Sequence, residues 1–294
     1  MKWVRPFRGR VVRRETPLEA EPFVPGAGPD FLCIGAQKAG TTWLYQQLAA
    51  HPDFWMPPQK ELHYFNERGH APIQTTPRQQ DERDVRFLEK FRALGTKAWL
   101  DLPNYGQLFA GKGSLLSGDM TPAYSMLPDE IIALVLRCFP NLKVIFLARD
   151  PVERAWSQLS LGVRTGGIPA FDVANPAQAM HHLLRPLVLQ RSFPSMIAAR
   201  WRRHVPADQF QIYFFDDLKR DPARLRRSII EFLGADPEKA SGQVRAETNV
   251  AATVQKLPLC DEVRVRIAEF FADELKTCAA ELGGAAREWP SRYL

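Results

Sequence analysis

Three short segments of the chain are apolar at nearly every position, and they limit the folds open to it. A strand with one face in water alternates apolar and polar residues, whereas a uniformly apolar strand is buried on both faces of a parallel sheet. Helical patterns separate these segments, which predicts an α/β fold: a single domain over residues 30–294 with a central parallel sheet flanked by helices. The expected strands are residues 31–34, 143–148 and 209–215, with a short one at 115–118; the expected helices include 41–50, 128–137, 224–233 and 261–282, and one carrying Val85, Leu88, Phe91 and Leu94.

The formal net charge of +6 comes from the first residues and not from the rest of the chain. Residues 1–14 hold six of the 39 basic residues and no acidic one, so the remainder has 33 basic and 33 acidic residues. A neutral body argues against a dedicated nucleic-acid binder. Residues 1–29 are expected to form a basic N-terminal extension and linker, which either contacts a membrane or nucleic acid or stays solvated.

Apolar runs and cysteines indicate neither a membrane protein nor a metalloprotein. The longest apolar runs, such as Ile131–Leu136, hold six residues, whereas a membrane helix needs about 20. The four cysteines lie far apart and form no CxxC pair, so no metal site is expected and nothing demands an oxidising compartment. The expectation is a cytoplasmic protein without a transmembrane segment or a secretory segment.

The stretch GAQKAGTT at residues 35–42 lies between the first expected strand and the helix that follows it. Its glycines allow a tight turn, its lysine adds a positive charge, and its threonines offer hydroxyls at a helix N-terminus, where the dipole favours anions. The alternative is an ordinary strand–helix turn with an incidental lysine. As a phosphate-binding loop, the stretch would act through Gln37, Lys38, Ala39, Gly40, Thr41 and Thr42.

This loop differs from the Walker A motif, in which the lysine follows the last glycine. Lys38 precedes Gly40. A kinase also needs carboxylates to hold Mg²⁺, whereas the strand at 143–148 is followed by the cation Arg149. A sulfuryl group carries less negative charge and needs only lysine and backbone donors. An atypical P-loop kinase and a non-catalytic nucleotide- or polyanion-binding protein remain as alternatives.

A second anion site is indicated at residues 149–157, RDPVERAWS. Arg149 ends the 143–148 strand, and Ser157 lies two turns into the next helix, which Asp150 is placed to cap. An arginine fork and a hydroxyl together suit a second phosphate. The alternative is a helix cap with a surface ion pair.

The chain resembles the sulfotransferases that use 3′-phosphoadenosine-5′-phosphosulfate (PAPS), and among them the heparan-sulfate-type and bacterial carbohydrate enzymes. Five motifs stand in the order of that family, from about residue 30 to the C-terminus. Besides the two anion-binding segments they are KELHYF at 60–65, GDMTPAY at 118–124, and FDDL at 215–218 with FLG at 232–234. The chain departs from heparan-type enzymes at Thr42, where they often carry a basic residue, and at Met120, where they have lysine.

The resemblance implies a P-loop-like sulfotransferase fold and a role for each matching residue. The 35–42 loop would bind the 5′-phosphosulfate, Arg149 and Ser157 the 3′-phosphate, and Lys38 would stabilise the leaving phosphate. Glu61 is the expected general base, with His63 as the alternate; in an extended segment the two would point the same way. The alternative for Glu61 is a solvated carboxylate paired with Lys60. Lys256, in residues 249–257, is the candidate cation of a segment that closes over the nucleotide.

The implied reaction moves a sulfuryl group to a hydroxyl, or less expectedly an amine, and yields adenosine 3′,5′-bisphosphate without a metal. The acceptor is expected to be a carbohydrate or a small natural product, selected by residues 66–112 and 162–208. Thr121 and Tyr124 are expected to line a pocket, and Trp99 or Tyr105 to stack on a sugar ring. The basic residues between Arg191 and His204 would either meet an acidic acceptor or form a solvated face.

Overall fold

The computed structural model describes residues 28–66, 81–95, 100–239, 244–247 and 256–293, and its centre is the expected parallel sheet. Four strands lie in the order β2-β1-β3-β4, and every neighbouring pair is parallel. They are β1 (Phe31–Gly35), β2 (Gly118–Asp119), β3 (Lys143–Ala148) and β4 (Phe210–Phe214). The two central strands, β1 and β3, are buried at every position except the first of β3. Their uniformly apolar sequences therefore predicted their place correctly.

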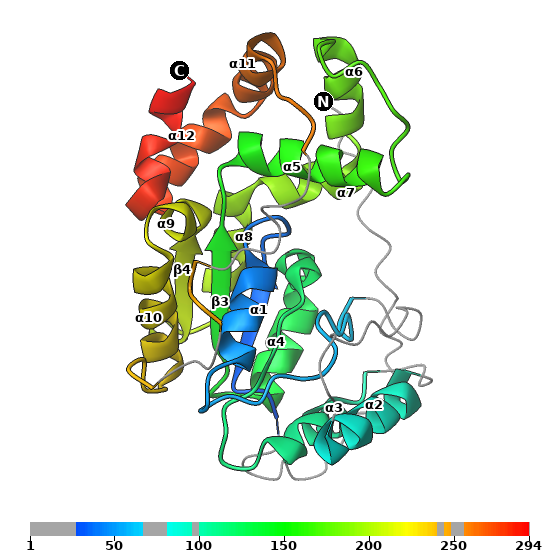
Figure 1. Cartoon of the computed structure of the whole chain (residues 1–294), viewed down its shortest axis with the longest axis vertical. Coiled ribbons are helices and arrows are strands. Elements are labelled where there is room, and N and C mark those ends of the chain that lie inside the picture. The colour runs from blue at the N-terminus through cyan, green and yellow to red at the C-terminus, as the bar shows by residue number, and fades with distance from the viewer. Residues whose placement is uncertain (1–27, 67–80, 96–99, 240–243, 248–255, 294) are drawn as a thin grey trace.

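Helices cover the sheet and extend beyond both of its ends (Figure 1). The helix α5 follows β3 directly and crosses beyond the carboxyl end of that strand, where α11 and α12 also lie, whereas α2 and α3 lie at the opposite end of the molecule. The helices are α1 (Thr41–Ala49), α2 (Glu82–Gly95), α3 (Leu102–Gln107), α4 (Asp129–Cys138), α5 (Pro151–Arg164), α6 (Pro176–Leu183), α7 (Pro186–Leu189), α8 (Pro194–Arg202), α9 (Phe215–Arg220), α10 (Pro222–Leu233), α11 (Asp261–Phe270) and α12 (Ala272–Glu281). Short 3₁₀ turns include η2 (Pro122–Met126), η3 (Gln190–Ser192), η6 (Gly284–Glu288) and η7 (Pro290–Arg292).

The single helix expected over residues 261–282 is wrong, because the chain breaks at Phe271 into α11 and α12. Phe271 is buried, and its ring packs against that of Phe193, 5.5 Å away. The break directs α12 toward the start of α8, where the Glu274 carboxylate accepts a hydrogen bond from the Ser195 amide at 2.9 Å. Tertiary packing therefore overrides a helical periodicity that runs through the break.

Two further elements differ in detail from the sequence prediction. The short strand falls at Gly118–Asp119, at the end of the expected 115–118 segment and one residue beyond it. In α2 the predicted apolar stripe holds for Leu88, Phe91 and Leu94, but Val85 is 46% exposed. Asp84 is buried instead, because its carboxylate accepts a hydrogen bond from the Trp55 indole at 3.1 Å.

Several expectations concern residues outside those described, namely most of the 1–29 extension, Trp99, and residues 249–255 of the proposed closing segment. Within the described ranges, no helix has the length and apolar character of a membrane span. The four cysteines are free thiols, of which Cys33 and Cys278 are buried.

Candidate active site

The 35–42 loop leads from the end of β1 into α1 at the carboxyl edge of the sheet. Gly40 precedes the helix with φ of 95°, and a Cβ built on it would lie 2.6 Å from the Leu218 side chain, so only glycine fits there. No side chain caps the first turn of α1, which leaves backbone N–H groups directed at the loop. Thr41 is buried, whereas the Thr42 side chain is exposed at the same turn. The loop therefore has the features of an anion-binding turn.

Arg149 joins this loop to the second predicted anion site. Its Nη1 donates to the carbonyl of Lys38 at 2.6 Å, and its Nη2 donates to the Glu153 carboxylate at 3.0 Å. The guanidinium lies over the Phe215 ring, 4.2 Å from the centroid. Its Nε is buried and has no partner among the described residues. The two segments thus meet at one edge of the sheet, as a single ligand with two anionic ends requires.

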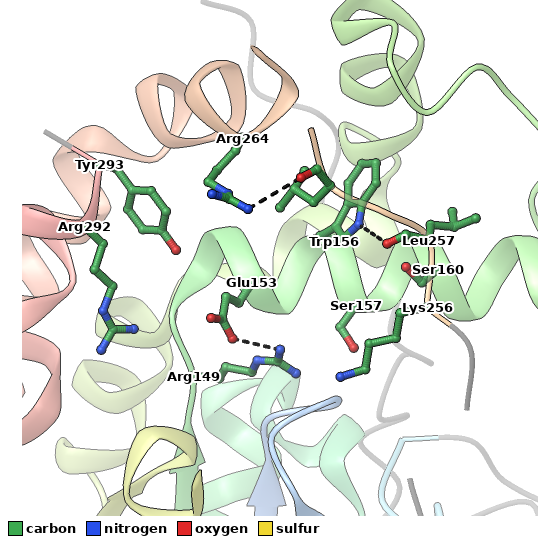
Figure 2. A pocket seen from close by; sticks show the side chains of 11 residues that line it. Arg149, Glu153, Trp156, Ser157, Ser160, Lys256, Leu257, Arg264, Arg292 and Tyr293 are labelled. Carbon is green, nitrogen blue, oxygen red and sulfur yellow. Dashed lines mark hydrogen bonds and ion pairs between the residues drawn. The ribbon is translucent and has the colours of Figure 1, made fainter. Parts of the chain in front are cut away.

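A cavity of about 430 Å³ lies along α5 (Figure 2). Three predicted cofactor-binding residues line it, and Figure 2 shows Arg149, Ser157 and Lys256 on the same side of that helix. Local sequence places two of them, because Asp150 caps α5 through the amides of Val152 and Glu153. The remaining lining residues are Glu153, Trp156, Ser160, Leu257, Leu259, Arg264, Arg292 and Tyr293.

Lys38 is half-buried among other cations. Burial lowers the pKa of its ammonium group, and the positive charges of Arg164, Arg149 and Lys256 lower it further. Each of these charges destabilises the others while the site holds no anion. An anionic ligand at this place therefore relieves a repulsion that the fold has built in.

Sequence reasoning missed the contribution of the C-terminal turn and the contact of Arg191 with the 35–42 loop. The Tyr293 hydroxyl donates to the Asp150 carboxylate at 2.8 Å, and Arg292 reaches the same oxygen at 3.3 Å. Burial raises the pKa of Asp150 to about 6. Arg191 donates to the side-chain oxygen of Gln37, so this predicted cofactor-binding residue already has a protein partner. No motif surrounds these three residues, and only their positions in the fold reveal them.

The basic stretch around Arg191 is neither one solvated face nor one binding surface. Arg203 and His204 pair with the carboxylate of Asp129 at 2.9 and 2.6 Å. Arg191, by contrast, turns toward the 35–42 loop. The stretch therefore divides between surface ion pairs and the candidate site.

Glu61 and His63 come together on an irregular segment. The Glu61 carboxylate pairs with Lys60 and lies 3.5 Å from Nε2 of His63. Burial would raise the pKa of Glu61, but the hydrogen bond from His63 and the charge of Lys60 outweigh it and lower the pKa to about 2. The segment is not extended, because Glu61 and His63 have φ of 66° and 54° in the left-handed region. Their side chains nevertheless meet.

This pair lies beside the strand that leads into the loop. A Cβ built on Gly35, the last residue of β1, would lie 3.0 Å from the carbonyl oxygen of Pro122, and the neighbouring Thr121 accepts a hydrogen bond from the amide of His63 at 3.3 Å. The loop with Lys38 begins at Gly35. The candidate base and the candidate anion site therefore lie at the same edge of the sheet.

Thr121 and Tyr124, expected to line a pocket, and Tyr105, expected as a candidate to stack on a sugar ring, are core residues instead. Thr121, Tyr124 and Tyr105 are each 0% exposed, so none of them contacts a ligand directly. Their hydroxyls all donate to the buried carboxylate of Asp119. Met120, which departs from the heparan-type pattern, is buried as well. Among the residues that the structure describes, no group of three or more His, Cys, Asp and Glu side chains is placed to hold a metal ion.

Comparisons with known proteins show which family and which chains this one is similar to. The sulfotransferase family model matches residues 29–239. The membrane-associated sulfotransferase kil1 of Dictyostelium discoideum is 29% identical over 136 residues, which cover 46% of this chain and 23% of that protein. The heparan sulfate glucosamine 3-O-sulfotransferase 3B1 of Mus musculus is 25% identical over 227 residues, covering 75% of this chain and 50% of that protein. The chain thus spans half or less of the length of these relatives.

Solved structures share the fold at low sequence identity. A sulfotransferase from Alicyclobacillus acidocaldarius superposes with a TM-score of 0.63 and 22% identity, over 90% of this chain and 99% of that chain. The mouse sulfotransferase SULT7A1, solved in complex with PAP, has a TM-score of 0.50 and 13% identity, over 90% of this chain and 89% of that chain. These likenesses agree in the central parallel sheet with its P-loop-like turn.

Proposed function

The chain belongs to the sulfotransferase family, as its motifs predicted, and we propose that it transfers a sulfuryl group from PAPS to a hydroxyl group of a carbohydrate or small natural product. The observation that carries the proposal is the hydrogen bond from Arg149 to the carbonyl of Lys38. It joins two anion-binding segments that are 111 residues apart in sequence. PAPS carries one anionic group at its 3′ end and another at its 5′ end, and so matches a site of this form.

The residues at the site fit such a donor. The uncapped first turn of α1 and Lys38 would hold the 5′-phosphosulfate, and Arg149, Ser157 and Lys256 would hold the 3′-phosphate. The Nε of Arg149, which is buried without a partner among the described residues, supplies a donor for that phosphate. When bound, PAPS provides the sulfuryl group and departs as adenosine 3′,5′-bisphosphate. The mouse sulfotransferase of the same fold that was solved with PAP supports this choice of donor.

On the acceptor side, Glu61 is the general base in our proposal. The side-chain nitrogen of Asn66 lies 3.1 Å from Nδ1 of His63, and Nε2 of the same ring faces Glu61. With Nδ1 accepting and Nε2–H donating, a neutral His63 has no basic nitrogen left. This arrangement favours Glu61 as the proton acceptor and gives His63 the role of holding it.

The proton moves as the new bond forms. The acceptor oxygen bonds to sulfur, the bond from sulfur to the bridging oxygen breaks, and the electron pair stays on that oxygen. Lys38 stabilises the charge that develops there. Because a carboxylate with a pKa of about 2 is a weak base, Glu61 takes the proton late, once bonding to sulfur has made the hydroxyl more acidic.

No specific observation favours the two alternatives. The Glu153 carboxylate is the acidic group that lines the cavity, and both Arg149 and Lys219 bind it. It is therefore engaged and does not offer the free ligands that a kinase needs for Mg²⁺. A purely nucleotide-binding protein has no use for an ionised carboxylate beside the loop.

One assay distinguishes these functions. The protein is incubated with radiolabelled PAPS and a panel of oligosaccharides, small alcohols, phenols and amines. We expect labelled hydroxyl products, lost in Lys38→Ala and Glu61→Ala and retained in Lys90→Ala, a control at an exposed lysine of α2. Phosphate transfer from ATP and Mg²⁺ would favour the kinase, and binding of adenosine 3′,5′-bisphosphate without turnover would favour the binding protein.

A further inference from the structure

The segment that carries Glu61 and His63 has a backbone that its own sequence does not favour. Both residues lie in the left-handed region, with φ of 66° and 54°, and neither is a glycine. Such conformations are disfavoured for residues with a Cβ and persist only where the surroundings enforce them. No regular element includes residues 61–63. Contacts from elsewhere in the chain must therefore hold the segment.

Two hydroxyl groups make those contacts. Oγ1 of Thr121 accepts a hydrogen bond from the amide of His63 at 3.3 Å. The hydroxyl of Tyr124 accepts one from the next amide, that of Tyr64, at 3.0 Å. Two consecutive backbone N–H groups are thus bound by side chains about 60 residues further along the chain.

A single carboxylate orients both hydroxyls. Thr121 donates to Oδ1 of Asp119 at 2.7 Å, and Tyr124 donates to Oδ2 at 2.7 Å. An ionised carboxylate only accepts hydrogen bonds, so both hydroxyl protons point at Asp119 and both hydroxyl lone pairs remain for the amides of residues 63 and 64. Asp119 therefore sets the direction of two parallel chains that run from carboxylate to hydroxyl to amide.

The carboxylate itself is held firmly. Asp119 is 1% exposed and belongs to β2, where it pairs with Leu32 of β1. Tyr105 donates a third hydrogen bond to it at 2.9 Å. The ring of Tyr105 also stacks on that of Tyr64, with centroids 5.0 Å apart and planes 13° apart. The network thus connects the central sheet to the segment from two directions.

We propose that Asp119, acting through Thr121 and Tyr124, is a positioning residue that fixes the Glu61–His63 pair relative to the end of β1. This inference rests on the proposed function, because it gives the network a role in that reaction. The role extends to the GDMTPAY motif at 118–124, whose polar side chains do not reach the cavity. Asp119 touches neither donor nor acceptor and acts through the geometry of the base.

The test removes one hydroxyl at a time. Tyr124→Phe and Thr121→Val each delete a link between Asp119 and one amide, whereas Thr121→Ser keeps the hydroxyl. Tyr213→Phe is the matched control. Tyr213 lies in β4, outside the network, and is also mostly buried, and its hydroxyl donates to the carbonyl of Ser228 in α10 at 3.0 Å. The measurements are kcat and the KM for PAPS against pH, affinity for adenosine 3′,5′-bisphosphate by calorimetry, and the thermal unfolding midpoint.

We expect Tyr124→Phe and Thr121→Val to lower kcat at least tenfold relative to Tyr213→Phe, with the KM for PAPS and the affinity for the bisphosphate within twofold of wild type. Thr121→Ser retains kcat within threefold. The acidic limb of the kcat profile moves to higher pH in the first two variants, because Glu61 loses its fixed contacts with Lys60 and His63. A loss of folding alone would lower the amount of active protein and leave this limb in place.

The inference is overturned if the wild type is active and the Tyr124→Phe and Thr121→Val proteins have the same kcat as Tyr213→Phe. It is also overturned if the variants raise the KM for PAPS while kcat is unchanged, since the network would then act on the donor site. A wild type that transfers sulfate to no acceptor overturns the proposed function, and this inference with it.

Discussion

The donor side and the base side of the candidate site are built in different ways. The donor side lies at the ends of regular elements, where β1 leads into α1 and β3 leads into α5. Its cations Lys38, Arg149 and Lys256 converge, and the pKa of Lys38 is lowered by burial and by the other two charges. The base side lies on irregular backbone, and Lys60, Glu61 and His63 there bind one another.

This difference indicates how strongly a single substitution should affect each half of the site. On the donor side our proposal gives the holding of an anion to several cations, so the loss of one leaves the others in place. On the base side our proposal gives the proton transfer to a single carboxylate, and the backbone beside it donates hydrogen bonds to the distant hydroxyls of Thr121 and Tyr124. Substitutions in the two halves should therefore separate into effects on kcat and effects on donor binding.

The largest expected effect is that of Glu61→Gln on kcat. The amide keeps the shape of the side chain but cannot take the proton, and loss of a general base costs about 10²–10⁴ in rate. Affinity for adenosine 3′,5′-bisphosphate should stay within twofold of wild type, because Glu61 does not line the donor cavity. Steady-state kinetics and calorimetry check both numbers. A Glu61→Gln protein with wild-type kcat would show that Glu61 is not the base, and the contrast between a base side that sets kcat and a donor side that sets binding would then fail.

The next effect is that of Arg149→Lys on donor binding. The three N–H donors of a lysine radiate from one nitrogen, so they cannot cover the separate positions that Nη1, Nη2 and Nε of Arg149 occupy toward the Lys38 carbonyl, Glu153 and the phosphate. Loss of a charge-assisted hydrogen bond costs about 1.5–3 kcal/mol, which is roughly 10- to 150-fold in affinity. We expect this loss for adenosine 3′,5′-bisphosphate and little change for adenosine 5′-monophosphate, which lacks the 3′-phosphate. Equal losses for the two nucleotides would place Arg149 outside the 3′-phosphate site.

A smaller effect is expected for Lys256→Ala. Lys256 is exposed and shares its cavity with Arg149, Arg264 and Arg292, so its removal should cost about 1 kcal/mol or less, roughly fivefold in the KM for PAPS. Raising the salt concentration should shrink this difference, since an exposed charge is screened. Lys276→Ala, at an exposed lysine of α12, is the control. A hundredfold rise in KM would mean that the donor side depends on a single cation after all.

The smallest effect concerns stability in acid. The pKa of Glu61 is lowered from 4.5 to about 2, although burial opposes the shift, because His63 and Lys60 stabilise its charge. Its contribution is therefore present above pH 4.5 and is lost as the pH falls through about 2, and it amounts to about 1 kcal/mol after allowance for solvent. Urea unfolding of wild type and Glu61→Gln at pH 6, 4 and 3 should show a difference that shrinks toward low pH. A difference independent of pH would contradict the ion pairing.

Local patterns correctly predicted the strands and turns from which the proposed donor side is built. The uniform burial of β1 and β3 followed from their apolar sequences, and the loop and Asp150 cap followed from residues that are neighbours in sequence. The same reasoning failed for Thr121 and Tyr124, expected to line a pocket, and for Tyr105, expected as a candidate to stack on a sugar ring, because all three are buried around Asp119. The sequence around a threonine or tyrosine near a functional motif is the same whether its hydroxyl faces a ligand or a buried carboxylate, so the sequence does not distinguish the two cases.

The amino-acid sequence alone determined the parallel sheet, the two candidate anion-binding turns and their order along the chain, because strand burial, glycine turns and helix caps depend on nearby residues. Tertiary structure decided that Arg149 reaches the carbonyl of Lys38, that Glu61 meets His63 on left-handed backbone, and that Tyr293 closes on Asp150. These contacts depend on how whole elements pack. Residues that are far apart in sequence and meet only through packing produce no pattern in the sequence between them, so local analysis cannot predict the contact.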